Sequence, residues 1–134
     1  MSAVKVLIID DEKDFATTLS ERLVLRGFDA SAVFSVTDAM EAAQTIQPDV
    51  ILQDLTMPGM DGSEVFLKLK TIDPDFEIII ISGQLLPADD IAVLKENAFD
   101  YILKPVEIKE IVEKINDAWQ KRQKSLKKRD QHNG

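Results

Sequence analysis

The sequence contains no cysteine, so neither a disulfide bond nor a thiolate metal site can take part in its fold or chemistry. This absence suits the reducing cytoplasm, which is the location that we expect. Long hydrophobic runs are also absent. No purely aliphatic stretch is longer than Ile78–Ile81, which is far short of the roughly 20 residues that span a bilayer. The apolar run after Lys5 ends at Asp10 and Asp11, which is unlike a signal peptide. We therefore expect no membrane segment and no signal peptide.

Positive charge is scarce and is concentrated near one end of the chain. The net charge is −8, from 16 basic and 24 acidic residues. Residues 121–134 contain six basic residues and one acidic residue, so the part before them is more acidic than the whole. An acidic body repels nucleic acid, and we expect this domain not to bind it directly. We interpret 121–134 as a solvated helix end or a linker, the usual role of a charge run.

The rest of the sequence alternates short apolar runs with amphipathic segments. Some runs, such as Ile78–Ile81, lack the alternation of a half-exposed strand, so helices should cover both of their faces in a parallel sheet. We expect strands at Val4–Ile9, Asp29–Val33, Val50–Gln53, Glu77–Ile81 and Tyr101–Leu103. We expect helices at about Asp14–Arg26, from a cap at Ser35 or Thr37 to before Pro48, from Ser63 to Ile72, at about Ala88–Asn97, and from Ile108 to Trp119.

Residues at the ends of the amphipathic segments predict where helices begin and end. Gly27 is a C-terminal stop for the first helix. Pro48 ends the second, because the residue before a proline avoids the helical region. Ser63 is expected to cap the third helix. Asn97 is expected to adopt the left-handed conformation that ends the fourth.

The residues at the expected strand ends predict a site. Five βα units give an α/β fold with an open, doubly wound parallel sheet, in which sites form at the carboxyl ends of the strands. The polar side chains at these ends are Asp10, Asp11, Asp54, Ser82 and Lys104. Three carboxylates, a hydroxyl and an ammonium group on one rim suit a hard divalent cation together with phosphate oxygens. An aspartate can also accept a phosphoryl group covalently.

Four motifs resemble those of the response regulator receiver domains, and the resemblance covers about Val4 to Ala118. They are Ile8-Ile9-Asp10-Asp11-Glu12, Asp54-Leu55-Thr56-Met57-Pro58-Gly59-Met60-Asp61-Gly62, Ile81-Ser82-Gly83, and Asp100-Tyr101-Ile102-Leu103-Lys104-Pro105. Each motif alone is weak, but the set in this order is specific. The resemblance implies a (βα)5 fold with the flavodoxin-like strand order 2-1-3-4-5. We expect residues 1–120 to form the receiver domain, followed by a basic tail or the start of a linker at 121–134.

The resemblance implies a phosphoryl acceptor and a magnesium site. Asp54 would take the phosphoryl group from a histidine kinase or a phosphotransfer protein. Asp10, Asp11 and Asp54 would bind Mg²⁺ together with the backbone carbonyl of Thr56, and Asp10 would act largely through water. The domain would therefore be a switch rather than an enzyme.

The resemblance also implies how the switch works. Lys104 would pair with the phosphoryl oxygens, and Ser82 would swing to donate a hydrogen bond to them. Tyr101 would move inward and change the surface of the fourth helix, fifth strand and fifth helix. The Lys104–Pro105 peptide bond would be cis, which is inexpensive only before proline. A downstream output domain or protein would read the change, and a homodimer formed on phosphorylation is also open.

Two other functions use related folds. A small Mg²⁺-dependent aspartyl-phosphate phosphatase would have a second aspartate two residues after the nucleophile, where this sequence has Thr56. A flavodoxin-like cofactor module would have a Ser/Thr/Gly-rich phosphate loop after the first strand. Asp10-Asp11-Glu12 would repel a phosphate there in the absence of a metal. Both alternatives fit the sequence less well than the receiver domain.

Overall fold

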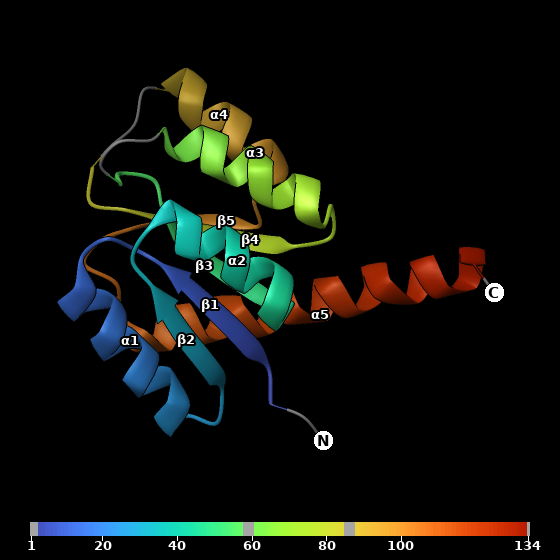
Figure 1. Cartoon of the computed structure of the whole chain (residues 1–134), viewed down its shortest axis with the longest axis horizontal. Coiled ribbons are helices and arrows are strands. Elements are labelled where there is room, and N and C mark those ends of the chain that lie inside the picture. Colours follow the sequence, from blue (N-terminus) through green and yellow to red (C-terminus); the bar gives the residue numbers. More distant parts are fainter. Residues whose placement is uncertain (1–2, 58–60, 85–87, 134) are drawn as a thin grey trace.

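The computed structural model describes residues 3–57, 61–84 and 88–133, in which five strands alternate with five helices (Figure 1). The strands are β1 (Lys5–Ile9), β2 (Asp29–Val33), β3 (Val50–Asp54), β4 (Glu77–Ser82) and β5 (Asp100–Leu103). The helices are α1 (Lys13–Leu25), α2 (Val36–Ile46), α3 (Gly62–Ile72), α4 (Ala88–Asn97) and α5 (Ile108–Asn133). Pro58, Gly59 and Met60 of the second motif lie outside the described residues. None of the described helices combines the length and the apolarity of a membrane span.

The strands form one parallel sheet in the order β2-β1-β3-β4-β5, as predicted. After β2 the chain crosses to the other side of β1, so the order of the strands reverses between β1 and β3. Chain segments leave the sheet in opposite directions at such a point and leave a crevice at the carboxyl ends. The crevice therefore lies beside Ile9 and Asp54, the last residues of these two strands.

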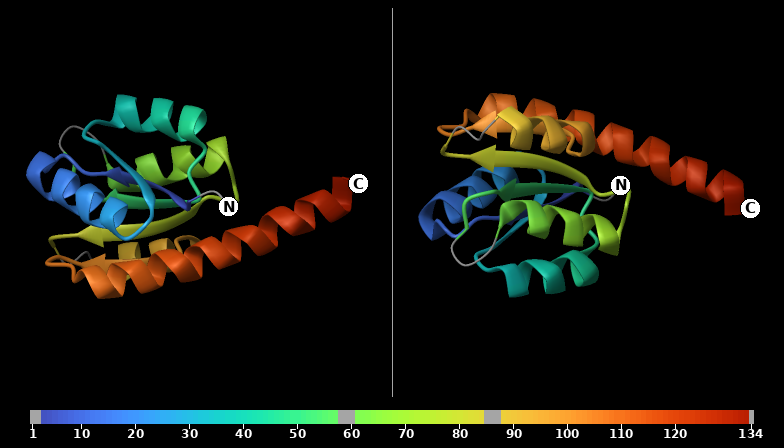
Figure 2. Two further views of the ribbon diagram at one scale, coloured as in Figure 1. Left: turned by 90° about the horizontal axis from the view of Figure 1, so that it is seen from below. Right: turned by 90° about the horizontal axis from the view of Figure 1, so that it is seen from above.

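Helices cover both faces of the sheet, as the continuous apolar runs predict (Figure 2). Every residue of β3 and β4 is buried. On one face, α1 and α5 contribute Ala16, Leu19, Leu23, Ile111, Ile115 and Ala118. On the other face, α2, α3 and α4 contribute Ala39, Ala43, Val65, Phe66, Leu69 and Leu94.

The ends of the first two helices follow the sequence. Gly27 lies just beyond α1 with a φ of +92°, the left-handed conformation that glycine adopts at low cost. Ser35 is the N-cap of α2, and its side chain accepts a hydrogen bond from the backbone N–H of Asp38. The helix ends at Ile46, before Pro48, through Gln47 with a φ of 52°.

Two predicted helix caps are wrong. The N-cap of α3 is Asp61, whose carboxylate accepts from the Ser63 backbone N–H at 2.8 Å, so Ser63 already lies inside the helix. A carboxylate is also the better partner for the positive end of the helix dipole. Asn97 is the last residue of α4 and not a left-handed residue after it. The Ala98 N–H bonds to the Leu94 carbonyl in helical fashion, and the chain then enters β5 directly.

Helix α5 continues past Trp119 to Asn133 and projects beyond the body of the domain (Figures 1 and 2). Arg122, in the basic segment, is buried rather than solvated: it is 6% exposed, and its guanidinium lies 5.4 Å from the Phe76 ring centroid. The solvated interpretation is therefore wrong for this residue, because the helix carries it against the loop that precedes β4. The division of the chain at residue 120 stays a prediction.

Two arginines of α5 bind two aspartates of the loop between α3 and β4. Arg122 donates to the Asp75 carbonyl at 3.0 Å and to the Asp73 carboxylate at 3.2 Å. Arg129 pairs with the carboxylates of Asp73 and Asp75. Burial raises the pKa of Asp73, but the Asp75 N–H and the two guanidinium groups lower it more, so the net pKa lies below its usual value. We call these four residues the arginine clamp.

Candidate functional site

The ends of four strands place the predicted side chains at one edge of the sheet. Asp10 follows β1, Asp54 ends β3, Ser82 ends β4, and Lys104 follows β5. Asp10, Asp54 and Ser82 are buried, which is unusual for such polar groups unless they have partners or a function. The site therefore lies at the crevice that the strand order creates.

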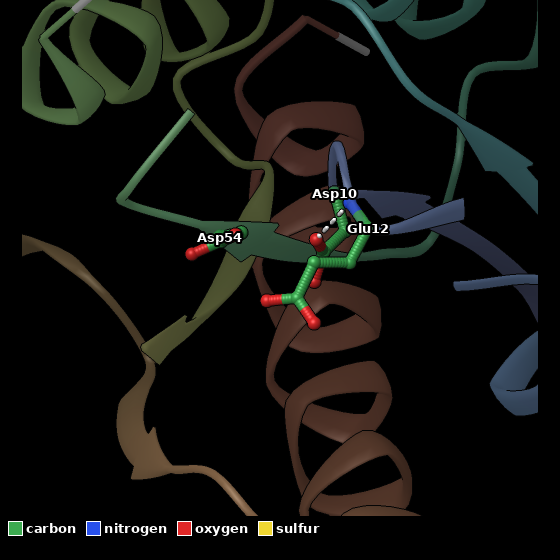
Figure 3. A group of neighbouring side chains, drawn as sticks. All are labelled: Asp10, Glu12 and Asp54. Carbon is green, nitrogen blue, oxygen red and sulfur yellow. Dashed lines mark hydrogen bonds between the residues drawn. The ribbon is translucent and has the colours of Figure 1, made fainter. Parts of the chain in front are cut away.

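Three carboxylates meet at this crevice. One oxygen from each of Asp10, Glu12 and Asp54 lies within 4.8 Å of the others (Figure 3). The Glu12 backbone N–H donates to Asp10 Oδ1 at 2.9 Å and holds that carboxylate in place. We call Asp10, Glu12 and Asp54 the acidic cluster. Asp11 is half-buried and does not belong to it, so its predicted metal contact stays a prediction.

Glu12 was missed as a site residue. Its position directly after Asp10-Asp11 was the available signal, but that position also fits the start of a helix, and Glu12 is in fact the N-cap residue of α1. Its carboxylate is exposed and reaches back to the rim. A contact of this kind depends on a side-chain conformation that spacing alone does not determine.

Lys104 supplies the positive charge of the site. Its ammonium nitrogen lies 2.9 Å from Asp10 Oδ2, 3.0 Å from Glu12 Oε1 and 3.7 Å from Asp54 Oδ2. The Lys104–Pro105 peptide bond that follows is cis, as the resemblance implies. The fold thus brings Lys104 next to Asp10 and Glu12, which lie more than ninety residues earlier in the sequence.

Burial and charge change the pKa values of this pair. Burial raises the pKa of Asp10 to about 6, the nearby Asp54 charge adds to the increase, and the bonds from Lys104 and the Glu12 N–H oppose it. Burial also lowers the pKa of Lys104, but its bonds to Asp10 and Glu12 raise it more, so the net pKa lies above its ordinary value. A buried carboxylate with a raised pKa favours a cation next to it.

The two oxygens of Asp54 have different surroundings. Oδ1 accepts hydrogen bonds from the backbone N–H and the hydroxyl of Thr56, both at 3.0 Å. Oδ2 is buried and has no hydrogen-bond partner among the described residues. One oxygen is therefore anchored and the other is free to react or to bind a ligand. Thr56 contacts Asp54 through its donors, and the role of its carbonyl stays a prediction.

Ser82 and Tyr101 meet at the backbone of Gln84. The Ser82 hydroxyl donates to the Gln84 carbonyl at 2.9 Å and accepts from its N–H at 3.1 Å. The Tyr101 hydroxyl donates to the same carbonyl at 3.0 Å. Ser82 thus donates within its own loop in this structure, and a turn toward Asp54 would break a bond to the carbonyl that Tyr101 shares. The sequence did not predict this role of Gln84.

The donor set fits a hard divalent cation. It consists of carboxylate oxygens, with no sulfur or imidazole among the described groups, and it includes Oδ2 of Asp54, which accepts no hydrogen bond from these residues. Mg²⁺ prefers such oxygen ligands and usually keeps several waters. The site can therefore hold Mg²⁺ next to a carboxylate that is able to react.

Comparisons with known proteins agree with the motifs. A family model for the response regulator receiver domain matches residues 6–116. The chain is 30% identical over 128 residues to the C4-dicarboxylate transport transcriptional regulatory protein DctD of Rhizobium meliloti, covering 96% of this chain and 28% of that protein. It is 32% identical over 115 residues to the transcriptional regulatory protein PrrA of Mycobacterium leprae, covering 86% and 49%. The chain thus spans half or less of these relatives.

Solved structures are also similar. A response regulator receiver domain protein from Clostridium thermocellum has a TM-score of 0.81 at 30% identity, covering 92% of this chain and 98% of that one. A CheY-like receiver domain protein from Methanospirillum hungatei has a TM-score of 0.85 at 22% identity, covering 92% and 99%. At that identity the second match supports the fold alone.

Proposed function

The chain belongs to the response regulator receiver domain family, and we propose that Asp54 is its phosphoryl acceptor in a Mg²⁺-dependent transfer. The observation that carries the proposal is the Asp54 carboxylate, which is buried, anchored through one oxygen and without a hydrogen bond at the other. Lys104 faces that free oxygen at 3.7 Å. The family match favours this function over the phosphatase alternative.

We propose that Asp10, Asp11 and Asp54 hold Mg²⁺ together with the backbone carbonyl of Thr56. When bound, Mg²⁺ neutralises negative charge on the phosphoryl group that is transferred. Asp54 attacks the phosphorus atom of a phosphohistidine, an oxygen–phosphorus bond forms, and the phosphorus–nitrogen bond breaks. Lys104 attracts the phosphoryl oxygens, and its exchange of carboxylate partners for these oxygens keeps its charge compensated.

Incubation with acetyl phosphate and Mg²⁺ should add one phosphoryl group to the protein, measured by intact mass. Asp54→Asn should add none, because it removes the only nucleophile that we assign. Asp38→Asn, which removes an exposed carboxylate from α2, should react like the wild type. EDTA should prevent the reaction. An Asp54→Asn protein that still gains the group would contradict the proposal.

We further propose that Ser82 and Tyr101 carry the signal from Asp54 to the face formed by α4, β5 and α5. The physical basis is the Gln84 carbonyl, which accepts from both hydroxyls. When Ser82 turns to a phosphoryl oxygen, this acceptor loses one donor, and Gln84 can move together with Tyr101. The change then reaches the face formed by α4, β5 and α5, whose residues are far from Asp54 in the sequence.

Beryllofluoride, a phosphoryl mimic, should with Mg²⁺ shift the amide NMR signals of α4 and β5 as well as those near Asp54. In Ser82→Ala the shifts near Asp54 should remain and those of α4 and β5 should largely disappear, because the hydroxyl that couples them is gone. Ser82→Thr keeps a hydroxyl and should respond like the wild type. Equal α4 and β5 shifts in Ser82→Ala would show that another residue couples the two regions.

The proposed upstream partner is a histidine kinase or a phosphotransfer protein, and the proposed location is the cytoplasm. The relatives are named as transcriptional regulators and are at least twice as long as the matched region. We propose that residues 1–120 act as the receiver domain for an output domain or a separate output protein. The acidic body is not suited to bind nucleic acid itself, and a phosphorylation-dependent homodimer remains a further proposal.

A further inference from the structure

We infer that Phe15 is a positioning residue that holds the Lys104 ammonium group at the acidic cluster during phosphoryl transfer. The inference rests on the proposed function and adds a residue that lies outside the four motifs. Phe15 lies in α1, is half-buried, and packs against the apolar cluster that includes Leu19 and Leu23 of the same helix. Its ring has a second role because the Lys104 ammonium group lies over it.

The ring and the ammonium group are close enough for a cation–π interaction. Lys104 Nζ lies 4.4 Å from the centroid of the Phe15 ring. Three other lysines lie 5.7 to 5.9 Å from phenylalanine rings, near the outer limit for this interaction. The Lys104 side chain is only 12% exposed, and cation–π attraction strengthens as water is excluded.

Lys104 needs a partner that does not change during the reaction. Its present partners are carboxylates, and under the proposed function Asp10 turns to Mg²⁺. Glu12 is an exposed side chain that water can replace. The Phe15 ring has no hydrogen-bonding group that would compete for phosphoryl oxygens, and it is not a ligand for Mg²⁺. It therefore stays with the ammonium group while the carboxylates exchange partners.

The ring also lines an open path for the lysine side chain. Phe15 and Lys104 both line a groove of about 650 Å³ between α1 and the start of α5. The lysine stem is long and flexible, so an ammonium group without a fixed partner would spend time in this groove rather than at Asp54. The ring opposes that motion because leaving it costs the cation–π attraction.

The test compares leucine and tyrosine at position 15. Phe15→Leu should slow the initial rate of phosphorylation by acetyl phosphate and Mg²⁺ on the order of threefold to tenfold, the range of a cation–π contact. Phe15→Tyr keeps an aromatic face and should restore a rate within about twofold of the wild type. Phe99→Leu makes the same change beneath Lys121, next to the amino end of β5, and should leave the rate unchanged.

A second measurement tests the contact without the reaction. In the metal-free protein, the ring current of Phe15 should shift the Lys104 Hε NMR signals upfield, and Phe15→Leu but not Phe99→Leu should abolish the shift. A folded Phe15→Leu protein with the wild-type rate, or a Phe15→Tyr protein as slow as Phe15→Leu, would overturn the inference. A wild-type protein that gains no phosphoryl group would contradict the proposed function instead. The ring-current shift of the Lys104 Hε signals would then decide alone whether the Phe15 ring holds the ammonium group.

Discussion

Arg122→Ala is expected to destabilise the protein by about 3 kcal/mol, the lower end for breaking a buried ion pair, because Asp73 keeps Arg129 as a partner. The substitution leaves the Asp75 carbonyl without its donor and uncovers the ring of Phe76. Urea unfolding followed by circular dichroism measures the loss as a lower midpoint at an unchanged slope. Lys128→Ala, which removes an exposed charge from the same part of α5, should change stability little.

The effect of Arg122→Ala should shrink in acid. The clamp holds the pKa of Asp73 below its ordinary value of 3.8, so its contribution is complete above that pH and is lost as the pH falls through the folded-state pKa. The stability difference from the wild type should therefore be largest near neutral pH and decrease below about pH 4. A difference that is independent of pH would mean that Arg122 stabilises the fold through its bond to the Asp75 carbonyl and its packing on Phe76, and not through the charge of Asp73.

The same reasoning applies to the proposed domain boundary. A chain that ends after residue 120 lacks both arginines of the clamp, so it should lose at least as much stability as Arg122→Ala. Restoring residues 121–129 should recover the loss, and restoring them with Arg122→Ala and Arg129→Ala should not. A truncated protein as stable as the full chain would show that the residues after 120 do not contribute to the stability of the domain, as the predicted boundary implies.

Gly62→Ala is expected to cost about 3 kcal/mol, the upper range for overpacking a well-filled site. A Cβ at this position would lie 2.4 Å from the Leu55 carbonyl oxygen and 2.7 Å from Leu55 Cα. Both are backbone atoms, so α3 or the segment after β3 must move to make room. Gly83→Ala is the matched control, because its Cβ would meet only the Lys104 side chain, at 3.9 Å.

The movement forced by Gly62→Ala should also reach the site. Leu55 directly follows Asp54, and the backbone carbonyl of Gly62 accepts a hydrogen bond from the Gln53 side chain on the other side of Asp54. Phosphorylation by acetyl phosphate should therefore slow even where the protein is still folded, at low temperature. An unchanged rate and an unchanged unfolding midpoint would mean that the close contact at Leu55 relaxes without cost.

Local patterns predicted most of the fold because the signals lie within each element. Continuous apolar runs identified the buried strands, and Gly27 and Pro48 ended helices through their own backbone preferences. The caps at Ser63 and Asn97 were wrong where two neighbouring residues could serve, since Asp61 caps α3 and α4 passes into β5 without a left-handed residue. Such choices depend on how closely the segments pack.

The site, like the fold, has features that local patterns predicted and contacts that they did not. Strand ends placed Asp10, Asp54, Ser82 and Lys104 on one rim, because the carboxyl ends of parallel strands share an edge. The contacts of Phe15 and Arg122 were not predicted. They join residues far apart in the sequence, and a half-buried phenylalanine or a basic residue in a charged run has the same pattern with or without such a partner.

Helix α5 has a mechanical consequence. Its 26 residues form a rod about 39 Å long at about 1.5 Å per residue. Arg122 and Arg129 are two turns apart, so the clamp supports the rod at a second place beyond its base on the sheet. A tilt of about 5° at the base would displace the far end by about 3 Å at this length. A small change of packing beneath α5 thus becomes a larger displacement at the C-terminal end of the helix. The arginine clamp sets how much of the tilt reaches that end.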